Sequence, residues 1–478
     1  MTRHRIQLQP LAEDQLAEIE ATAYRLLDEV GIALQHARAT EMLHGLGCRV
    51  EKGRVLIPPS IVRWGLDHIT GQRVYYSIDG SQAFALGDGA IRVHNGGGPP
   101  FVQDLESGAR RPATTQDVAD MTRLLDALPN VDMVMPFFGP QDVPPEIINI
   151  AAFAIGLRNS RKPTASPASE NANEVRYSVE MAAACAGGLE ALRKGPNLII
   201  AVSPVSPLTF TDKVTSAILA VAEAGICFHS LPAPILGASG PITMAGALAQ
   251  QHAEVLASFV IAAAARPGVP VVYSSRISSL DLRTATSSWG GPEVGMAGAC
   301  AAQLAHRIGV PCDTYGLSTD SSCLDPQFAY QRMANAMVPA LAGADILSGV
   351  GTVESGLSGS FEGAVIDDEM LGLVKHIVRG CEVSDETLAF EVMSQVIPAG
   401  GAFLSEMHTV KQMRRGAVWL PGVSERALRP SDAKGVVVRA RERAKSILAN
   451  HQVPPLPDDV DRELDEIVER ARRELAAG

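Results

Sequence analysis

Short runs of apolar and β-branched residues alternate with long alanine-rich segments through most of this chain. Each run ends at Gly, Pro or Ser and is followed by residues with the apolar spacing of a helix. We expect eight strands, at Ile91–His94, Val131–Phe138, Lys162–Ser166, Asn197–Ser203, Cys227–Leu231, Val269–Ser274, Val310–Tyr315 and Asp345–Val350. This alternation is typical of repeated βα units and predicts an α/β fold with a parallel sheet.

The segments between these runs predict the helices of the same units. They are Ala113–Leu128, Pro145–Asn159, Asn171–Leu192, Asp212–Ala224, Ala245–Ala264, Pro292–Ile308, Asp325–Ala342 and Ile366–Val378. Eight βα units predict a (β/α)8 TIM barrel. An open doubly wound sheet is the alternative, but the stretch from His94 to Pro100 lacks the G-x-G-x-x-G spacing that would favour it.

Two extensions flank the predicted barrel. We expect an N-terminal helical extension with a short hairpin over residues 1–85, the barrel over 86–382 and a C-terminal helical extension over 383–478. The hairpin is predicted at Cys48–Ile57. The last stretch, Asp458–Ala477, alternates charge sign at i, i+4 spacing, which indicates either a solvated helix face or a helix that packs against a partner or second subunit.

Composition excludes several classes of protein. Hydrophobic residues make up 46% of 478, enough for a full core, and the net charge of −12 without a basic stripe argues against nucleic-acid binding. Seven cysteines without a C-x-x-C pair disfavour a disulfide framework and a structural zinc site. The apolar stretch Ala253–Ala265 is shorter than the ~20 residues that cross a bilayer. We expect a cytoplasmic protein with no membrane or nucleic-acid partner.

A TIM barrel carries its active site at the carboxyl ends of its strands, and several common motifs are missing from the sequence there. There is no H-E-x-x-H, no G-x-S-x-G and no Walker loop. Lys162 lies near the start of its strand, which disfavours Schiff-base chemistry. The nearby carboxylates, Asp320, Glu293 and Glu354, are few for divalent-metal chemistry, so we expect no bound metal.

Aromatic residues gather near the strand ends, although they make up only 5% of the chain. The rings are those of Phe101, Phe137, Phe138, Tyr273, Trp289, Tyr315 and Phe361. Aromatic faces around a cavity suit a quaternary ammonium ion, each contributing roughly 0.5–2 kcal/mol once water is excluded. The alternative is that these rings fill the barrel or pack its loops.

Three polar residues at the same end each allow two interpretations. His94 could anchor a substrate carboxylate or bond to loop backbone. Arg276 could clamp a carboxylate or form a surface salt bridge. Glu293 follows Pro292 at a helix start, where a carboxylate either caps the helix or acts on substrate.

Four stretches carry a resemblance to the trimethylamine methyltransferase family, and the similarity extends over nearly the whole chain. They are Gly96–Val102, Leu236–Leu248, Gly291–Glu293 and Tyr315–Ser321. The resemblance implies a TIM barrel that passes a methyl group from an amine to the Co(I) corrinoid of a separate protein docked over the barrel mouth. The chain itself would bind no cofactor tightly, and we expect it to form a homo-oligomer.

Archaeal members of that family carry pyrrolysine just after the seventh strand, where this chain has ordinary residues, Gly316–Thr319. A quaternary ammonium has no lone pair for pyrrolysine to activate, and its positive charge already makes the tertiary amine a good leaving group. The chain therefore resembles the glycine betaine:corrinoid methyltransferases. We expect a betaine or similar small amine as substrate.

The aromatic residues at the strand ends and the missing pyrrolysine suggest roles for individual residues. We expect Glu293, Asp320 and Tyr315 to serve catalysis, with the two carboxylates orienting the substrate or complementing its charge. We expect the substrate to contact His94, Asn95, Phe138, Tyr273, Arg276, Leu317 and Ser318, with Tyr273, Tyr315 and Phe138 forming the aromatic cage. Two other functions stay open, a metal-assisted lyase or aldolase on small acids and a betaine-binding barrel without catalysis.

Overall fold

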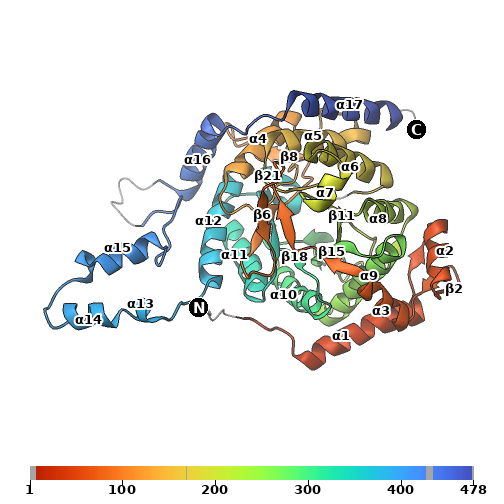
Figure 1. The fold of residues 1–478 in the computed structure, drawn as a ribbon, viewed down its shortest axis with the longest axis horizontal. Coiled ribbons are helices and arrows are strands. Elements are labelled where there is room, and N and C mark those ends of the chain that lie inside the picture. Colours follow the sequence, from red (N-terminus) through yellow and green to blue (C-terminus); the bar gives the residue numbers. More distant parts are fainter. Residues whose placement is uncertain (1–6, 168, 427–433, 476–478) are drawn as a thin grey trace.

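The computed structural model describes residues 7–167, 169–426 and 434–475, and its centre is a closed barrel of parallel strands (Figure 1). Seven strands adjoin in the order β10 (Thr164–Ala165), β11 (Leu198–Val202), β13 (Cys227–Ser230), β15 (Val269–Ser275), β18 (Cys312–Tyr315), β19 (Ile346–Val350) and β7 (Arg92–Asn95). The ring closes through two parallel bridges, His94 to Met133 and Val134 to Thr164. The predicted TIM barrel is confirmed.

Helices cover the outside of this barrel. They are α4 (Thr115–Ala127), α5 (Ile148–Asn159), α6 (Ala172–Ala186), α7 (Leu189–Lys194), α8 (Asp212–Ala224), α9 (Met244–Ala265), α10 (Pro292–Arg307), α11 (Pro326–Leu341) and α12 (Phe361–Val378). The single helix expected at Asn171–Leu192 is divided, because Gly187 and Gly188 have φ of 79° and 122° and end α6 in a conformation that other residues avoid.

Residues before the barrel cover its side and its floor. Helices α1 (Glu13–Arg25), α2 (Ala37–Gly45) and α3 (Pro59–Asp67) pack on α9, and β2 (Arg49–Glu51) and β3 (Arg54–Leu56) form the expected hairpin. A second hairpin, β5 (Val74–Tyr76) with β6 (Gln82–Ala85), places Tyr75 and Phe84 against Met133, Ile199 and Ile346 of the barrel wall. This apolar cluster fills the amino-terminal end of the barrel.

Short strands in the loops build two small sheets. One contains β20 (Thr352–Val353), β21 (Ser358–Ser360), β8 (Phe101–Gln103) and β9 (Arg110–Pro112), and the other contains β14 (Ile235–Leu236), β16 (Ser278–Asp281) and β17 (Thr286–Ser288). The remaining short strands are β1 (Ala33–Leu34), which pairs with β12 (Thr209–Phe210), and β4 (Ile69–Gly71), which pairs with β15. The loops that follow the barrel strands are thereby ordered.

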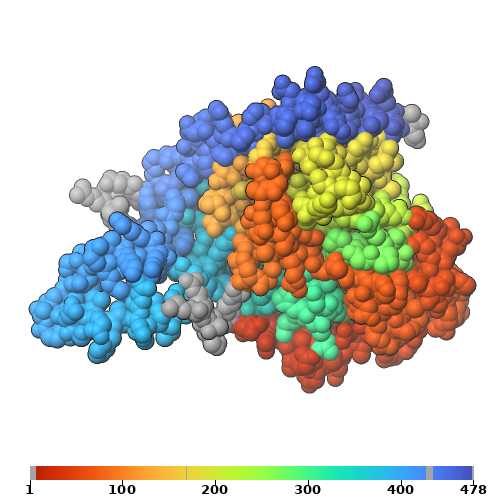
Figure 2. All heavy atoms as spheres, in the orientation of Figure 1, coloured from red at the N-terminus to blue at the C-terminus, as the bar shows by residue number. Residues whose placement is uncertain are grey.

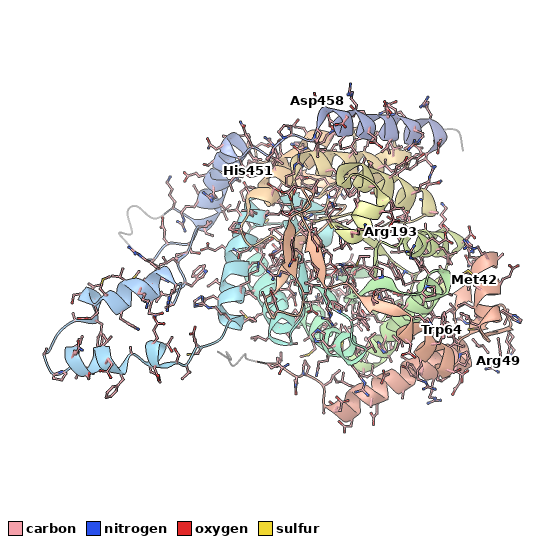
Figure 3. All side chains as sticks on the ribbon, viewed as in Figure 1. Met42, Arg49, Trp64, Arg193, His451 and Asp458 are labelled. Carbon is pink, nitrogen blue, oxygen red and sulfur yellow. The ribbon has the colours of Figure 1, made fainter. Side chains whose placement is uncertain are left out.

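The C-terminal residues divide into a packed part and a projecting part. Helix α16 (Val436–Asn450) packs on α12 and α4, and His451 bonds to Asp126 over 2.8 Å. Figure 3 shows His451 between α16 and α17. The charged helix α17 (Asp458–Leu475) packs on α5 and α6 and buries Leu464 and Ile467. One face of α17 therefore packs against helices of this chain's own barrel. The charge pattern indicated a solvated face or a face for a partner or second subunit, but not this packing.

Residues 383–420, which we call the arm, extend away from the barrel (Figures 1 and 2). The arm contains α13 (Asp385–Leu388), α14 (Phe390–Val396) and α15 (Met407–Arg414). Within the described ranges, we find no helix with the length and hydropathy that crossing a membrane requires.

Candidate active site

Four barrel strands bring charged side chains together around one carboxylate. Asp313 on β18 points into the barrel and is 2% exposed. Arg276, just after β15, places Nη2 3.1 and 3.0 Å from its two oxygens. His94 on β7 and His229 on β13 approach Oδ2 of Asp313, each at 3.3 Å. The cluster lies toward the carboxyl ends of the strands, where TIM barrels carry their active sites.

The charge of Asp313 is fixed by these neighbours. Burial raises the pKa of its carboxyl group, but the Arg276 guanidinium and His94 hold that pKa well below its usual value. Asp313 therefore stays ionised throughout the neutral range, and its contribution to stability is lost only when the pH falls through the lowered native pKa. Burial lowers the pKa of His229, which keeps that ring neutral.

The His94 ring faces a hydrogen-bond acceptor at both nitrogens. Nδ1 lies 2.7 Å from the carbonyl oxygen of Asn95, and Nε2 lies 3.3 Å from Asp313 Oδ2. A neutral imidazole has one N–H, whereas the imidazolium has two, so only the imidazolium can donate to both acceptors. His94 and Arg276 therefore both lie within hydrogen-bond reach of the Asp313 carboxylate.

An aromatic pair lies next to the cluster. Tyr315, two residues beyond Asp313 on the same side of β18, has its ring 5.3 Å from that of Trp289. The Arg276 guanidinium lies 5.6 Å from the Tyr315 ring, and the Tyr315 hydroxyl is 3.2 Å from Thr352 Oγ1. Both rings are half-buried. Ring faces and the Arg276 guanidinium therefore occur side by side.

The two carboxylates expected to serve catalysis have different surroundings. Asp320 accepts hydrogen bonds from Ser288 Oγ (2.6 Å), Trp289 N (2.7 Å), Gly290 N (3.0 Å) and Ser355 Oγ (2.7 Å). Four donors occupy the usual capacity of a carboxylate. Asp320 is therefore a positioning residue, since it holds Trp289 and its loop in place.

Glu293 is close to the same loop and has a free carboxylate. In the part of the chain that the structure describes, it forms neither a hydrogen bond nor an ion pair. Its side chain lies over Gly291, where an added Cβ would come 2.3 Å from Oε2. Any larger residue at position 291 would displace this carboxylate.

Tyr273 does not lie in the barrel mouth, which corrects our expectation for the aromatic cage. It is fully buried, and its hydroxyl lies 3.3 Å from His252 Nδ1 on α9. Side chains alternate along a strand, so Ser274 faces Asp313 while Tyr273 faces the helix layer. The prediction for Tyr273 was out of phase by one residue.

Phe138 also lies apart from the aromatic pair. It is buried and packs against Phe137 and Phe361, with ring centroids 4.7 and 6.4 Å away. An added Cβ on Gly359 of β21 would come 2.6 Å from the Phe138 ring. Phe138 therefore packs the loops, as in the alternative interpretation of the rings, and we no longer place it in the cage.

Three other residues that we expected to contact the substrate, Asn95, Leu317 and Ser318, instead contact other residues of this chain. Asn95 accepts a hydrogen bond from Met135 N and donates to Met135 O, which ties the first strand to the second. Leu317 is fully buried, and Ser318 Oγ accepts a hydrogen bond from Asn335 Nδ2 over 3.2 Å. In this structure all three residues shape the loops beside the site.

Sequence reasoning missed Asp313, His229 and Ser274, which lie within predicted strands. The available signal was a polar residue inside an apolar run, such as Asp313 after Val310-Pro311-Cys312. Among the described residues, no group of three or more His, Cys, Asp or Glu side chains is arranged to hold a metal ion. Arg276 lies against both oxygens of Asp313 and would repel a cation there.

The fold and the side chains collected at its mouth are those of a TIM-barrel enzyme. The sequence model of the family described as "Trimethylamine methyltransferase (MTTB)" matches residues 1–476. The chain is 30% identical over 470 residues to glycine betaine methyltransferase of Desulfitobacterium hafniense (strain Y51), covering 97% of each protein. It is also 30% identical over 469 residues to trimethylamine methyltransferase MttB of Desulfitobacterium hafniense (strain DSM 10664 / DCB-2), covering 97% of this chain and 94% of that protein.

The chain belongs to the trimethylamine methyltransferase family and is a methyltransferase of that family. The fold agrees with that of a solved relative. The crystal structure of the Methanosarcina barkeri monomethylamine methyltransferase superposes with a TM-score of 0.54 at 13% identity, covering 99% of this chain and 88% of that one. At this identity the likeness supports the barrel fold alone.

Proposed function

We propose that this protein transfers a methyl group from a quaternary amine, glycine betaine or a related betaine, to the Co(I) corrinoid of a partner protein. The observation that carries the proposal is the Trp289–Tyr315 ring pair beside the Arg276–His94 cluster. A betaine has a permanent cation and a carboxylate a few bonds apart, and these two subsites match both ends. The named activity of the glycine betaine methyltransferase relative supports the same substrate class.

In this proposal the rings hold the cation and the cluster holds the carboxylate. The trimethylammonium group lies against Tyr315 and Trp289, whose faces attract a desolvated cation. The substrate carboxylate approaches Arg276 and His94, whose N–H groups can donate hydrogen bonds to it. Glu293 adds a negative charge that complements the ammonium group. Asp320 contributes indirectly, because it fixes the position of Trp289.

The transfer itself requires no protein nucleophile. One methyl points out of the mouth, a bond from Co(I) to that carbon forms in line, and the carbon–nitrogen bond breaks. The electron pair of the broken bond stays on nitrogen and yields a neutral tertiary amine, so no proton moves. The chain's residues act by orienting the substrate and excluding water.

Exposed apolar side chains around the mouth support docking of the corrinoid protein there. Val205, Ile242, Leu282 and Leu357 lie in the loops after four different barrel strands and are all exposed. Loops that follow parallel barrel strands lie at the same end of the barrel, so these apolar residues belong to the face that carries the mouth. Apolar residues exposed on one face are typical of interaction sites. The seven unpaired cysteines favour a reducing compartment, so we place the reaction in the cytoplasm.

A spectroscopic assay tests the proposed reaction. Purified protein is mixed with reduced cobalamin and, in turn, glycine betaine, proline betaine, carnitine and trimethylamine, and methylcobalamin is followed by its absorbance. We expect methyl transfer from at least one betaine and little from trimethylamine. Failure with every quaternary amine would refute the reaction, and tight betaine binding without transfer would instead favour a binding protein.

A further inference from the structure

A fully buried ion pair lies behind the turn that follows the last barrel strand. Arg332 on α11 and Asp367 on α12 have side chains that are 0% exposed. Arg332 Nε lies 2.6 Å from Asp367 Oδ1, and Arg332 Nη2 donates to Asp367 Oδ2. Two bonds between a guanidinium and a carboxylate fix the relative orientation of both groups.

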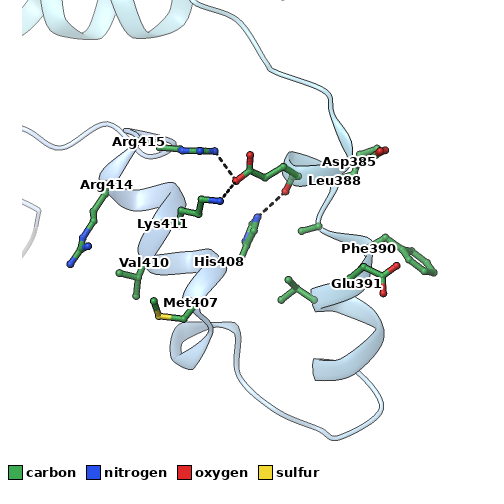
Figure 4. Close-up of a pocket in the computed structure, with 13 residues that line it drawn as sticks. Asp385, Leu388, Phe390, Glu391, Met407, His408, Val410, Lys411, Arg414 and Arg415 are labelled. Atoms are coloured by element: carbon green, nitrogen blue, oxygen red, sulfur yellow. Dashed lines mark hydrogen bonds and ion pairs between the residues drawn. The ribbon is translucent and has the colours of Figure 1, made fainter. Parts of the chain in front are cut away.

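An ion pair of the arm shows how different this burial is. Glu386 on α13 bonds to Lys411 and Arg415, on and just after α15, and all three side chains are at least 40% exposed (Figure 4). Surface pairs of this kind contribute about 0–1 kcal/mol. A buried pair must instead offset the lost hydration of both charges, which requires good alignment and further hydrogen bonds. We therefore ask where the remaining bonds of Arg332 and Asp367 go.

The remaining bonds go to the backbone of one turn between β19 and β20. Arg332 donates to Gly349 O over 3.0 Å and to Thr352 O over 2.6 Å. Asp367 Oδ2 accepts a hydrogen bond from Gly351 N over 2.7 Å. Side chains from two helices outside the barrel thus hold three backbone groups of this turn.

The same turn carries the hydrogen-bond partner of Tyr315. Thr352 Oγ1 lies 2.8 Å from Gly349 O and 3.2 Å from the Tyr315 hydroxyl oxygen. The one hydroxyl hydrogen of Thr352 goes to Gly349 O, so Tyr315 donates to Thr352 Oγ1. The Tyr315 ring lies 5.3 Å from that of Trp289. A continuous path of hydrogen bonds therefore leads from the ion pair to the aromatic pair.

We infer that Arg332 and Asp367 are positioning residues for the cation subsite. The inference rests on the proposed function, in which the Tyr315 ring holds the quaternary ammonium group. By fixing the turn, the ion pair fixes the Thr352 oxygen to which Tyr315 donates. A ring that is already held in the binding orientation loses less entropy when the cation arrives.

A double-mutant cycle separates this role from a general loss of stability. R332K keeps the charge but lacks the planar fork that bonds to the turn, and Y315F keeps the ring but lacks its hydroxyl. We expect each variant to raise the Kd of the preferred betaine roughly fivefold, because part of one ring's contribution is lost. The combined variant should bind no more weakly than either single variant, because both changes break the same path. Calorimetric titration measures the three constants.

The ring signal of Tyr315 provides a second measurement that needs no substrate. In protein with ¹³C-labelled tyrosine rings, the signal of Tyr315 among the seven tyrosines is assigned by its loss in Y315F. We expect this signal to shift or broaden in R332K. We expect the same in R332M/D367L, which removes both charges and so leaves neither one buried without its partner, a change that proteins tolerate.

The matched control is R158K. Arg158 on α5 bonds to Asp461 of α17 over 2.6 Å and is 27% exposed, so the same substitution breaks an ion pair that does not contact the turn. We expect R158K to keep the Kd and the Tyr315 signal of wild type.

Three results would overturn the inference. They are additive effects of R332K and Y315F on the Kd, an unchanged Kd in Y315F, and a Tyr315 signal that is the same in wild type, R332K and R332M/D367L. A Tyr315 signal that changes in a protein without affinity for any betaine would support the link from Arg332 to the ring. That result would refute the proposed substrate class instead, so the two failures are distinguishable.

Discussion

The two sides of the barrel wall use buried polar groups differently. Facing the helices, Tyr273 and Ser275 on β15 each bond to one neutral partner on α9, His252 and Gln251. Facing the axis, Ser274 lies beside Asp313, which is ionised and paired with the Arg276 guanidinium. Residues one position apart thus belong to different environments. The inner side holds a buried ion pair next to the proposed substrate site, while the outer side holds neutral contacts. Two nitrogens on that outer side, Gln251 Nε2 and His252 Nε2, are buried without a hydrogen-bond partner among the described residues.

Replacing Asp313 should have the largest effect of any change at this wall. D313N leaves the buried Arg276 guanidinium without its counter-charge, which typically costs about 3–5 kcal/mol of the free energy of unfolding. Without the Asp313 carboxylate, Arg276 and His94 also lose the partner that holds their side chains in place. We therefore expect kcat/KM to fall at least ~100-fold, equivalent to ~2.7 kcal/mol of transition-state stabilisation. Urea unfolding and the methyl-transfer assay measure the two effects.

The control for D313N is D345N, which changes a carboxylate at the start of β19. Asp345 bonds to His306 Nε2 and to Cys312 N, and an amide can still accept the second bond. We expect D345N to keep kcat/KM within about threefold. Equal losses of activity in the two variants would mean that general destabilisation, rather than the inner charge cluster, explains the effect.

Truncating either ring of the aromatic pair should weaken substrate binding, by less free energy than D313N costs in kcat/KM. W289L and Y315L each remove one ring face from the cation, so we expect the Kd of the preferred betaine to rise roughly tenfold, or about 1.4 kcal/mol. Calorimetric titration measures this. F138L removes a ring that packs away from the pair and should lower stability without changing the Kd.

The buried His252 on the outer side of the barrel wall should make the stability of the protein depend on pH. Burial lowers the pKa of His252 to about 3, so below pH 6.5 the unfolded state binds more protons than the folded state. Stability should therefore decrease as the pH falls, by about 2 kcal/mol between pH 7 and pH 5 from His252 alone. In H252Q this part of the decrease should be absent, as urea unfolding at several pH values would show. An identical decrease in wild type and H252Q would contradict the assignment.

Removing the Tyr273 hydroxyl should have the smallest effect. Y273F deletes one neutral hydrogen bond to His252, which costs about 1 kcal/mol of stability. Because the hydroxyl faces α9, we expect methyl transfer within about twofold of wild type. A large loss of activity with intact stability would show that the outer side contributes to the site after all.

Most of the barrel could be predicted from the sequence, because its elements are local. Seven of the eight predicted strands occur, and the helix at Asp212–Ala224 was predicted to the residue. The strand expected at Val131–Phe138 is reduced to two isolated bridges, at Met133 and Val134. Only part of the site could be predicted. His94, Arg276 and Tyr315 do meet, but barrel strands are apolar on both faces, so hydrophobicity does not reveal which of Tyr273 and Ser274 points inward.

The remaining features depend on contacts between distant parts of the chain. Asp313 and His94 are 219 residues apart, and no local pattern predicts their approach. The arm was expected to be part of a polar helical extension, since its apolar residues are interspersed with charged ones. Only the structure shows that these apolar side chains find almost no cover within the described chain.

The most direct measurement of the central claim is the NMR signal of ¹³C-methyl-labelled betaine bound to the protein. If its N-methyl groups lie against the Trp289 and Tyr315 ring faces, ring currents will shift their signal upfield. We predict this shift in wild type and Y273F and a clearly smaller shift in W289L, which keeps only the Tyr315 ring. An unshifted methyl signal under saturating conditions, or an equal shift in W289L, would contradict the account.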